Sequence, residues 1–306
     1  MEQSFSTLSI LCMIFNIIAG IGVPILLVVL IKKKNDMRIG PLFVGACAYI
    51  AANMFLQGIL DTVISLIAPF ANFLVNNAMP RAVIMAILHG AVQLGGYYLI
   101  IHMFMKDFQR KENSLLFGIG IRIIDSVMGY GLSAGVMLLS VAVSVNANGV
   151  DGYLGEYEAG SADAEAVRTY IMEMINMPLI EIVGMGIICI CLIFISISIS
   201  VLIFQVAKRP DKMYLLPTAG AINILNCLLA EMYSAGAIEG IGLFVVLLIL
   251  LAVFSCVIAF FVYKNDTDVE RGKADIVVNT RITTPDEMSM REKIARVNKS
   301  STPEDK

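Results

Sequence analysis

The chain has 306 residues, of which 58% are hydrophobic and 15% are charged, and its mean hydropathy is +0.81. A soluble domain is about half apolar and about a quarter charged, so this composition excludes an ordinary water-soluble protein and indicates a lipid environment. The formal net charge of −3 sums over groups on two sides of a membrane. It therefore points to no nucleic acid, and we expect none as a partner.

Seven apolar runs are long enough to cross a bilayer, whose core of about 30 Å requires about 20 residues of helix. The predicted spans cover residues 7–31, 41–68, 82–105, 115–145, 178–206, 213–233 and 241–263. The expected fold is therefore an all-α integral membrane protein, a seven-helix transmembrane bundle over residues 1–263. All six cysteines lie within these runs, which argues against a disulfide framework.

Two segments outside the spans are polar. The connection 146–177 is acidic, and its second half is predicted to form a short helix, because Ser161 can cap it and Asp163 and Glu165 suit its first turn. The tail, residues 264–306, carries balanced charge and few large apolar residues. We expect most of this tail to be disordered, because it cannot bury enough apolar surface to fold.

Lysine and arginine are divided unevenly between the two sets of loops. Ten lie on one side and two on the other: Lys32, Lys33, Lys34, Arg38, Lys106, Arg110, Lys111, Lys208, Arg209 and Lys212, against Arg81 and Arg168. Because basic loops stay on the cytoplasmic side, the N-terminus is predicted outside, the acidic connection outside and the tail in the cytoplasm. We expect a multi-pass protein of the plasma membrane, with the lipid bilayer as its first partner.

Polar side chains inside the spans need a structural or chemical reason, because they are costly in lipid. His89 and Gln93 are four residues apart in the third span and share a face, and the favoured interpretation of His89 is a hydrogen bond to a neighbouring helix. In the fourth span, Arg122 and Asp125 are three apart and are predicted to form a structural ion pair. A ligand or proton site is the alternative there.

The sixth span contributes Asn223 and Cys227, which share a face. At 1.5 Å of rise per residue, these two and Gln93 lie about 15–20 Å from the basic side, with Ile121 at about 10 Å. Residues of the third, fourth and sixth spans are therefore predicted to line one pocket. The second span adds a further acidic residue, Asp61.

Four stretches carry a family resemblance: LFVGACAY at 42–49, GAVQLGGYYLIIHMFMK at 90–106, LFGIGIRIIDS at 116–126 and YLLPTAGAINILNCLLAEMY at 214–233. With them, most of the membrane region resembles the YhfC family of predicted intramembrane metalloproteases, distant relatives of the CAAX-protease and bacteriocin-processing peptidases. That family carries Glu-Glu-x-x-Arg in the third span, Gly-x-Gly-His with a later Glu in the fourth, and His-x-x-x-Asp in the sixth. Such groups hold a divalent metal, taken to be zinc, and supply a general base.

On this chain, the resemblance places the two third-span glutamates on Gln93 and Leu94, and the arginine on Tyr97. The fourth-span histidine falls on Ile121 and the later glutamate on Asp125. The neighbouring glycines are retained. The spacing of the motifs is therefore kept while their ligands are replaced.

In the sixth span, the family's histidine falls on Asn223 and its aspartate on Cys227. Leu94 and Ile121 cannot bind a metal, and amides are weak ligands that cannot act as a base. The resemblance therefore implies a non-enzymatic relative with no catalytic residue, no metal and no cofactor.

The leading interpretation is that Gln93, Tyr97, Asn223 and Cys227 line a former active-site cavity that binds a membrane-embedded peptide, another membrane protein or a lipid-linked partner. One alternative is a transporter or permease component that uses Asp61, Arg122 and Asp125. A minor alternative is an active peptidase with atypical ligands.

Overall fold

The computed structural model describes residues 4–35, 38–108, 110–157 and 161–265, and these residues form helices joined by short turns, with no strand among them. Seven helical spans are long and apolar enough to cross a membrane: Thr7–Lys34, Gly40–Leu66, Ala78–Phe104, Glu112–Tyr153, Leu179–Lys208, Leu215–Ser234 and Ile241–Lys264. The prediction of an all-α protein with seven spans is confirmed. Which end faces the cytoplasm stays a prediction, and the predicted tail lies outside the described residues beyond Asn265.

The spans are built from α-helices and from three π-helical segments, in which the helix is wider than an α-helix. In chain order the elements are α1 (Thr7–Ile17), η1 (Ile18–Gly22), α2 (Val23–Asn35), α3 (Gly40–Tyr49), η2 (Ile50–Leu56), α4 (Gln57–Leu66), α5 (Ala68–Asn76), α6 (Ala78–Phe104), α7 (Glu112–Asp125), η3 (Ser126–Met137), α8 (Leu138–Tyr153), the 3-10 turn η4 (Leu154–Glu156), α9 (Ala162–Ile175), α10 (Leu179–Lys208), the 3-10 turn η5 (Pro210–Lys212), α11 (Leu215–Ser234) and α12 (Ile241–Lys264).

Two of these boundaries differ from the sequence-based expectation, and one expected helix is confirmed. The second span ends at Leu66, and the separate helix α5 begins at Ala68 with Pro69 in its first turn, where proline is tolerated. The fourth span continues to Tyr153, beyond the predicted end at 145, and bends at Gly149, whose φ is +72°. The predicted short helix is confirmed as α9, and the Ser161 hydroxyl accepts a hydrogen bond from the Ala164 N–H at 3.1 Å.

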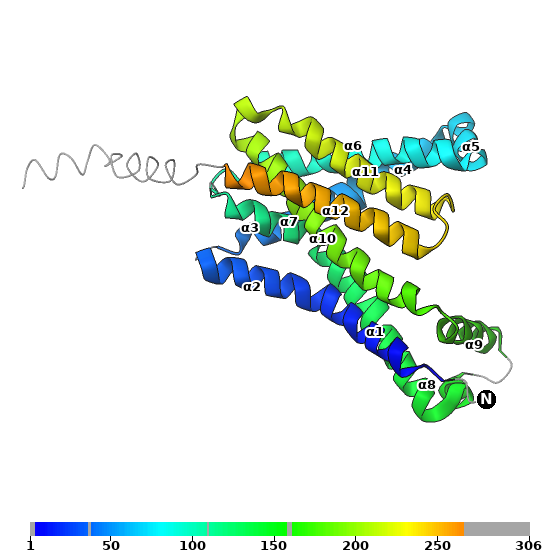
Figure 1. Ribbon diagram of the computed structural model, residues 1–306. Coiled ribbons are helices and arrows are strands. Elements are labelled where there is room, and N and C mark those ends of the chain that lie inside the picture. Colours follow the sequence, from blue (N-terminus) through cyan, green and yellow to red (C-terminus); the bar gives the residue numbers. More distant parts are fainter. Residues whose placement is uncertain (1–3, 36–37, 109, 158–160, 266–306) are drawn as a thin grey trace, which may run out of the picture. The chain divides into compact units, whose positions relative to one another are not determined.

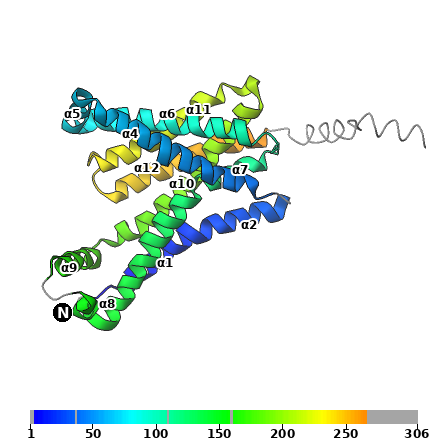
Figure 2. The ribbon, with the colours of Figure 1, turned by 180° about the vertical axis from the view of Figure 1, so that it is seen from behind.

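Helix α10 is the centre of the bundle. Of its most apolar stretch 72% is buried, against 22–39% for the other six spans. It packs against α12, α7, α1, α11 and α6. Figures 1 and 2 show it from two sides, running between α1 and α8 on one side and the α6–α11 pair on the other. Helix α10 therefore supports α6, α7 and α11, which carry most of the polar groups described below.

Glycines allow α7 to pack closely against two helices at once. A Cβ atom at Gly120 would overlap the Leu42 carbonyl oxygen of α3, and one at Gly45 would overlap the Phe117 carbonyl oxygen of α7. On the other side, a Cβ at Gly118 would lie 2.5 Å from the Cα of Ile197 in α10. The positions of residues 121–125, which follow these glycines, are thus fixed by backbone contacts.

We expect Gly120→Ala to destabilise the fold, because the atoms that the added Cβ would meet, in the Leu42 carbonyl group and at the Gly45 Cα, belong to the backbone and cannot rotate away. Overpacking of this kind costs about 1–3 kcal/mol. The matched control is Gly95→Ala on α6, where no atom lies within 4 Å of the added methyl group. That control should stay within about 1 kcal/mol of the wild type. Thermal unfolding in detergent measures both, and equal midpoints would contradict the close packing of α3 on α7.

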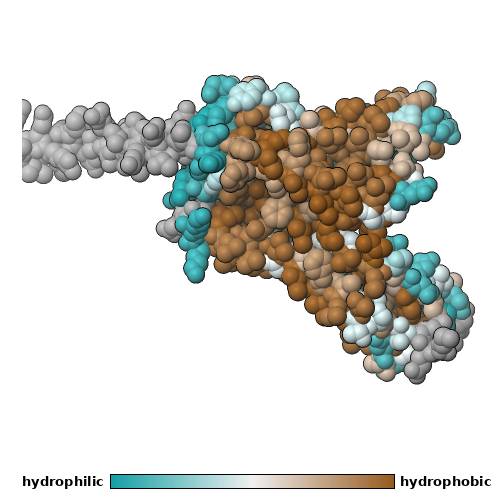
Figure 3. Space-filling model, in the orientation of Figure 1, coloured by the Kyte–Doolittle hydropathy of each residue, from teal (hydrophilic) through white to brown (hydrophobic). Residues whose placement is uncertain are grey.

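The surface between the two ends of the bundle is hydrocarbon. Leu, Ile, Val, Met and Phe side chains along most spans are more than a third exposed, as with Phe55 at 65% and Phe260 at 61%. Figure 3 shows this apolar region on one face, with hydrophilic residues gathered at its ends. Such exposure is unusual for a soluble protein and is what a bilayer core requires.

Candidate functional site

A cavity of about 630 Å³ lies among α4, α6, α7, η3, α10, α11 and α12, and we call it the central cavity. Its polar lining consists of Gln57, His89, Gln93, Arg122, Asp125, Tyr130, Asn226, Cys227, Glu231 and Tyr233. Hydrocarbon side chains of α10 and α12, such as Ile188 and Phe244, line the rest. Polar groups from four spans are thus gathered where a bilayer core would otherwise admit few.

Gln93 connects three helices at this cavity. Its side-chain oxygen accepts hydrogen bonds from Asn223 Nδ2 at 3.3 Å and from Cys227 Sγ at 3.5 Å, both on α11. Its Nε2 donates to Gln57 Oε1 on α4 at 3.3 Å. Asn223 also donates to the carbonyl oxygen of Gly90 at 2.8 Å. The structure therefore brings Gln93, Asn223 and Cys227 into direct contact, as the comparison of motifs suggested.

The predicted ion pair in the fourth span is confirmed. Arg122 Nη1 lies 3.2 Å from Asp125 Oδ2, and Arg122 Nε donates to the Ser196 hydroxyl of α10 at 3.0 Å. The side chains are 14% and 32% exposed, on the wall of the central cavity. Asp125 is the last residue of α7, directly before the π-helical segment η3, and such segments are frequent at functional sites.

His89 also bonds to neighbouring helices, as predicted, but to two of them. Its Nε2 lies 2.8 Å from Asp61 Oδ1 on α4, and its Nδ1 lies 3.2 Å from Glu231 Oε1 on α11. Sequence analysis named no partner for His89 and left Glu231 outside the site. One feature of the sequence could have indicated this contact: Asp61, His89 and Glu231 each lie in the half of their span that is nearest the predicted external side.

Four positions that were expected to line this cavity, Leu94, Tyr97, Ile121 and Asn223, lie outside its lining. Tyr97 is buried one turn beyond Gln93 and donates to Asn53 Oδ1 of η2 at 3.1 Å. Ile121 is fully buried in the apolar core, and Leu94 lies against Gly220 of α11. Asn223 reaches the cavity only through Gln93. Fewer of the motif positions on α6 and α11 therefore line the cavity than the motif spacing implied.

Asn226 is a lining residue whose hydrogen bonding is incomplete. It is 6% exposed, and its Oδ1 has no hydrogen-bond partner within the described part of the chain. A buried amide oxygen without a donor costs about 1–3 kcal/mol. This acceptor is available to a ligand that brings an N–H or O–H group.

The donors around the cavity do not fit a zinc ion. Within the described residues, no group of three or more His, Cys, Asp and Glu side chains could hold a metal. The two nitrogens of His89 face two different carboxylates, and the polar neighbours of Cys227 are amides. A protein zinc site needs three or four converging ligands, which this arrangement does not supply.

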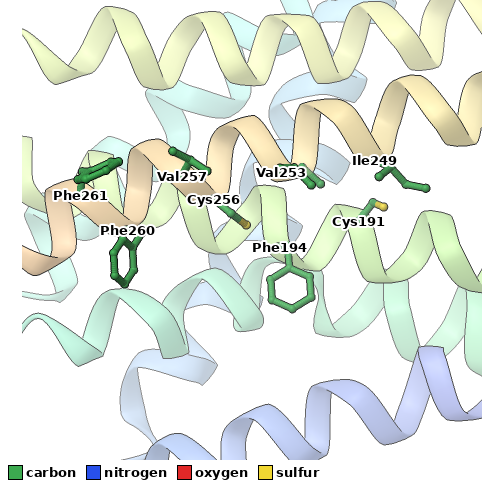
Figure 4. A pocket seen from close by; sticks show the side chains of 9 residues that line it. Cys191, Phe194, Ile249, Val253, Cys256, Val257, Phe260 and Phe261 are labelled. Carbon is green, nitrogen blue, oxygen red and sulfur yellow. The ribbon is translucent and has the colours of Figure 1, made fainter.

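A second space is apolar and lies between α10 and α12. It has a volume of about 620 Å³ and is lined by alanine, valine, isoleucine, phenylalanine and two cysteines, Cys191 and Cys256. Figure 4 shows these side chains along the two helices. With no charged or amide group, this groove offers no acid, base or ion site, so the central cavity is the candidate functional site.

Comparison with known proteins identifies one family. The model of the family described as YhfC intramembrane metalloprotease matches residues 19–262. Comparisons with curated proteins and with solved structures gave no match.

Proposed function

The chain belongs to the YhfC intramembrane metalloprotease family, and from this premise we propose that it is a member without proteolytic activity that binds a membrane-embedded peptide in the central cavity. The observation that carries the proposal is the contact of Gln93 with Asn223 and Cys227, which we call the Gln93 cluster. Where the family resemblance implies a carboxylate, an imidazole and a second carboxylate, this chain has two amides and a thiol that hydrogen-bond to one another.

The proposal that the chain is inactive follows from the chemistry of these groups. Metal-dependent hydrolysis needs a bound metal and a base that takes a proton from water. Gln93 and Asn223 cannot accept that proton, and Leu94 and Ile121 are hydrocarbon. Asp125 is the carboxylate at a motif position, and Arg122 already pairs with it at 3.2 Å.

A peptide suits the cavity because the lining combines a hydrocarbon surface with an unpaired hydrogen-bond acceptor. Ile188, Leu192 and Phe244 offer a hydrocarbon side for apolar side chains, and Asn226 offers an unpaired acceptor on α11. A transmembrane segment that unwinds needs partners for its backbone N–H groups, because lipid provides none. Asn226 Oδ1 would accept one of them.

Passage through the protein, the alternative, is less well supported. The cavity's lining includes no residue of the basic loops near Lys106 or Lys208. Between the Arg122–Asp125 pair and that end, Phe117 and Ile121 are buried at 0% and 1% exposure. A space that is closed by packed side chains at one end suits a ligand better than a transported solute.

We expect a photoreactive benzoylphenylalanine at Met185, which lines the central cavity, to cross-link to a polypeptide in cells. The same group at Phe194, in the apolar groove, is the control and should cross-link mainly to lipid. Asn226→Leu should reduce the Met185 product about fivefold to tenfold, since a lost hydrogen bond in a buried site is worth about 1–1.5 kcal/mol. Lipid adducts alone at Met185, or a polypeptide product that Asn226→Leu leaves unchanged, would contradict peptide binding.

A further inference from the structure

Three ionisable side chains from three spans meet at the end of the bundle where α5 lies. Asp61 comes from α4, His89 from α6 and Glu231 from α11, and the imidazole lies between the two carboxylates. His89 is 9% exposed, Glu231 24% and Asp61 48%. A single side chain thus ties three helices together.

This trio separates two spaces. One is the central cavity, and the other is a pocket of about 380 Å³ between α4, α5 and α6, lined by Asp61, Ser65, Leu74, Arg81 and Met85 among others, which we call the vestibule. His89 and Glu231 border both spaces, whereas Asp61 borders only the vestibule. The trio is therefore the wall between them.

The geometry shows how many protons are needed to keep both contacts of His89. Each ring nitrogen faces a carboxylate oxygen, at 2.8 Å and 3.2 Å, and such a contact needs one proton because two lone pairs repel. Two protons satisfy both contacts, either as an imidazolium between carboxylates or as an imidazole beside one carboxylic acid. When one proton leaves, one contact has two acceptors and no donor, so that tie breaks.

We propose that Asp61, His89 and Glu231 form a proton-binding site that closes the passage between the vestibule and the central cavity. With two protons the site ties α6 to both α4 and α11, and the passage is closed. With one proton only one tie remains, and α6 separates at this point from the helix whose tie is lost. This proposal concerns entry to the cavity and does not depend on what the cavity binds.

Other charged and titratable groups face the site from the helices around it, and they set the pH at which the proton leaves. In the vestibule this group is Arg81, on α6 itself. Across the central cavity they are Arg122, Asp125 and Tyr130 on α7 and η3, and Cys227 and Tyr233 on α11. The residues of α5, α10 and α12 that line these spaces carry no ionisable group.

The test measures how fast a reagent enters the cavity at different pH values. The full chain in lipid nanodiscs carries Cys227→Ser and one reporter, either Ala134→Cys in the central cavity or Ser65→Cys in the vestibule. A methanethiosulfonate bearing a trimethylammonium group labels each reporter. The same two reporters in a His89→Ala background give the intrinsic pH dependence of each thiol, and the Cys227→Ser parent gives the background from the other cysteines.

We expect the ratio of cavity to vestibule labelling to rise about tenfold per pH unit and then level off, because opening releases one proton. In His89→Ala the ratio should be high at every pH. A flat ratio with His89 present, or an unchanged pH dependence in His89→Ala, would overturn the proposal. Asp61→Asn provides a second arm that keeps the imidazole. The asparagine amide can donate to Nε2 while Nδ1–H donates to Glu231, so one proton then satisfies both contacts. The ratio should therefore stay low over the range in which it rises with Asp61 present, and an unchanged rise would also overturn the proposal.

Discussion

A variant carrying Gln93→Glu, Asn223→His and Cys227→Asp is expected to bind about one zinc ion per chain, whereas the wild type should bind far less than one. The three positions already have the spacing of metal ligands. Gln93 Oε1 lies 3.3 Å from Asn223 Nδ2 and 3.5 Å from Cys227 Sγ. Ligand atoms around tetrahedral zinc are about 3.3 Å apart, given metal–ligand bonds of about 2.0–2.1 Å. Elemental analysis of purified protein measures the zinc content.

The control for this variant keeps the two carboxylates and replaces the imidazole, as Gln93→Glu, Asn223→Leu and Cys227→Asp. It should bind zinc at least tenfold more weakly, since it lacks the imidazole ligand. If the restored variant folds and remains without zinc, these positions do not form a coordination frame, and the cavity is not a former metal site. Stoichiometric zinc in the wild type, lost in Cys227→Ser or Asp125→Asn, would contradict the proposed absence of metal chemistry.

The parts of this structure that were predictable depend on local sequence. Hydropathy gives the seven spans, because the bilayer imposes both the length and the composition of a helix. The Arg122–Asp125 pair follows from a spacing of three on one helix. The Ser161 cap follows from side-chain chemistry one turn away. In the ion pair and in the cap, both partners lie within a few residues of each other, and each span is a continuous run of residues.

The parts that were not predictable depend on packing between distant helices. The two partners of His89 are 28 residues before it and far beyond it on α11, and no spacing rule connects them. The π-helical segments η2 and η3 have the same apolar composition as the α-helices beside them. Tyr97 was placed in the cavity by its motif position, and the bond to Asn53 on η2 instead turns it into the core. Motif spacing locates a helix turn, and neighbouring helices decide which side chains of that turn face a cavity.

Breaking the Arg122–Asp125 pair is expected to be among the most costly single changes in the chain. Arg122→Met leaves the Asp125 carboxylate on the cavity wall without its cation, and Asp125→Leu leaves the guanidinium with the Ser196 hydroxyl as its hydrogen-bond partner among the described residues. Each should cost up to about 3–5 kcal/mol, the penalty for a fully buried uncompensated charge, because the two side chains are only 14% and 32% exposed. The double variant should recover most of this loss, because hydrocarbon can replace a buried pair nearly neutrally. Unfolding in detergent, monitored by denaturant titration, gives all three values.

The matched control is a pair at the other extreme of exposure. Arg168 and Asp151 also form an ion pair, but their side chains are 39% and 86% exposed, so Arg168→Met should cost no more than about 1 kcal/mol. Stability of the double variant close to that of the wild type would make the Arg122–Asp125 pair a replaceable structural element of the cavity wall. A double variant as unstable as either single variant would contradict this, since hydrocarbon would then fail to replace the pair. The transporter interpretation, in which these two charges serve a solute, would gain from that result.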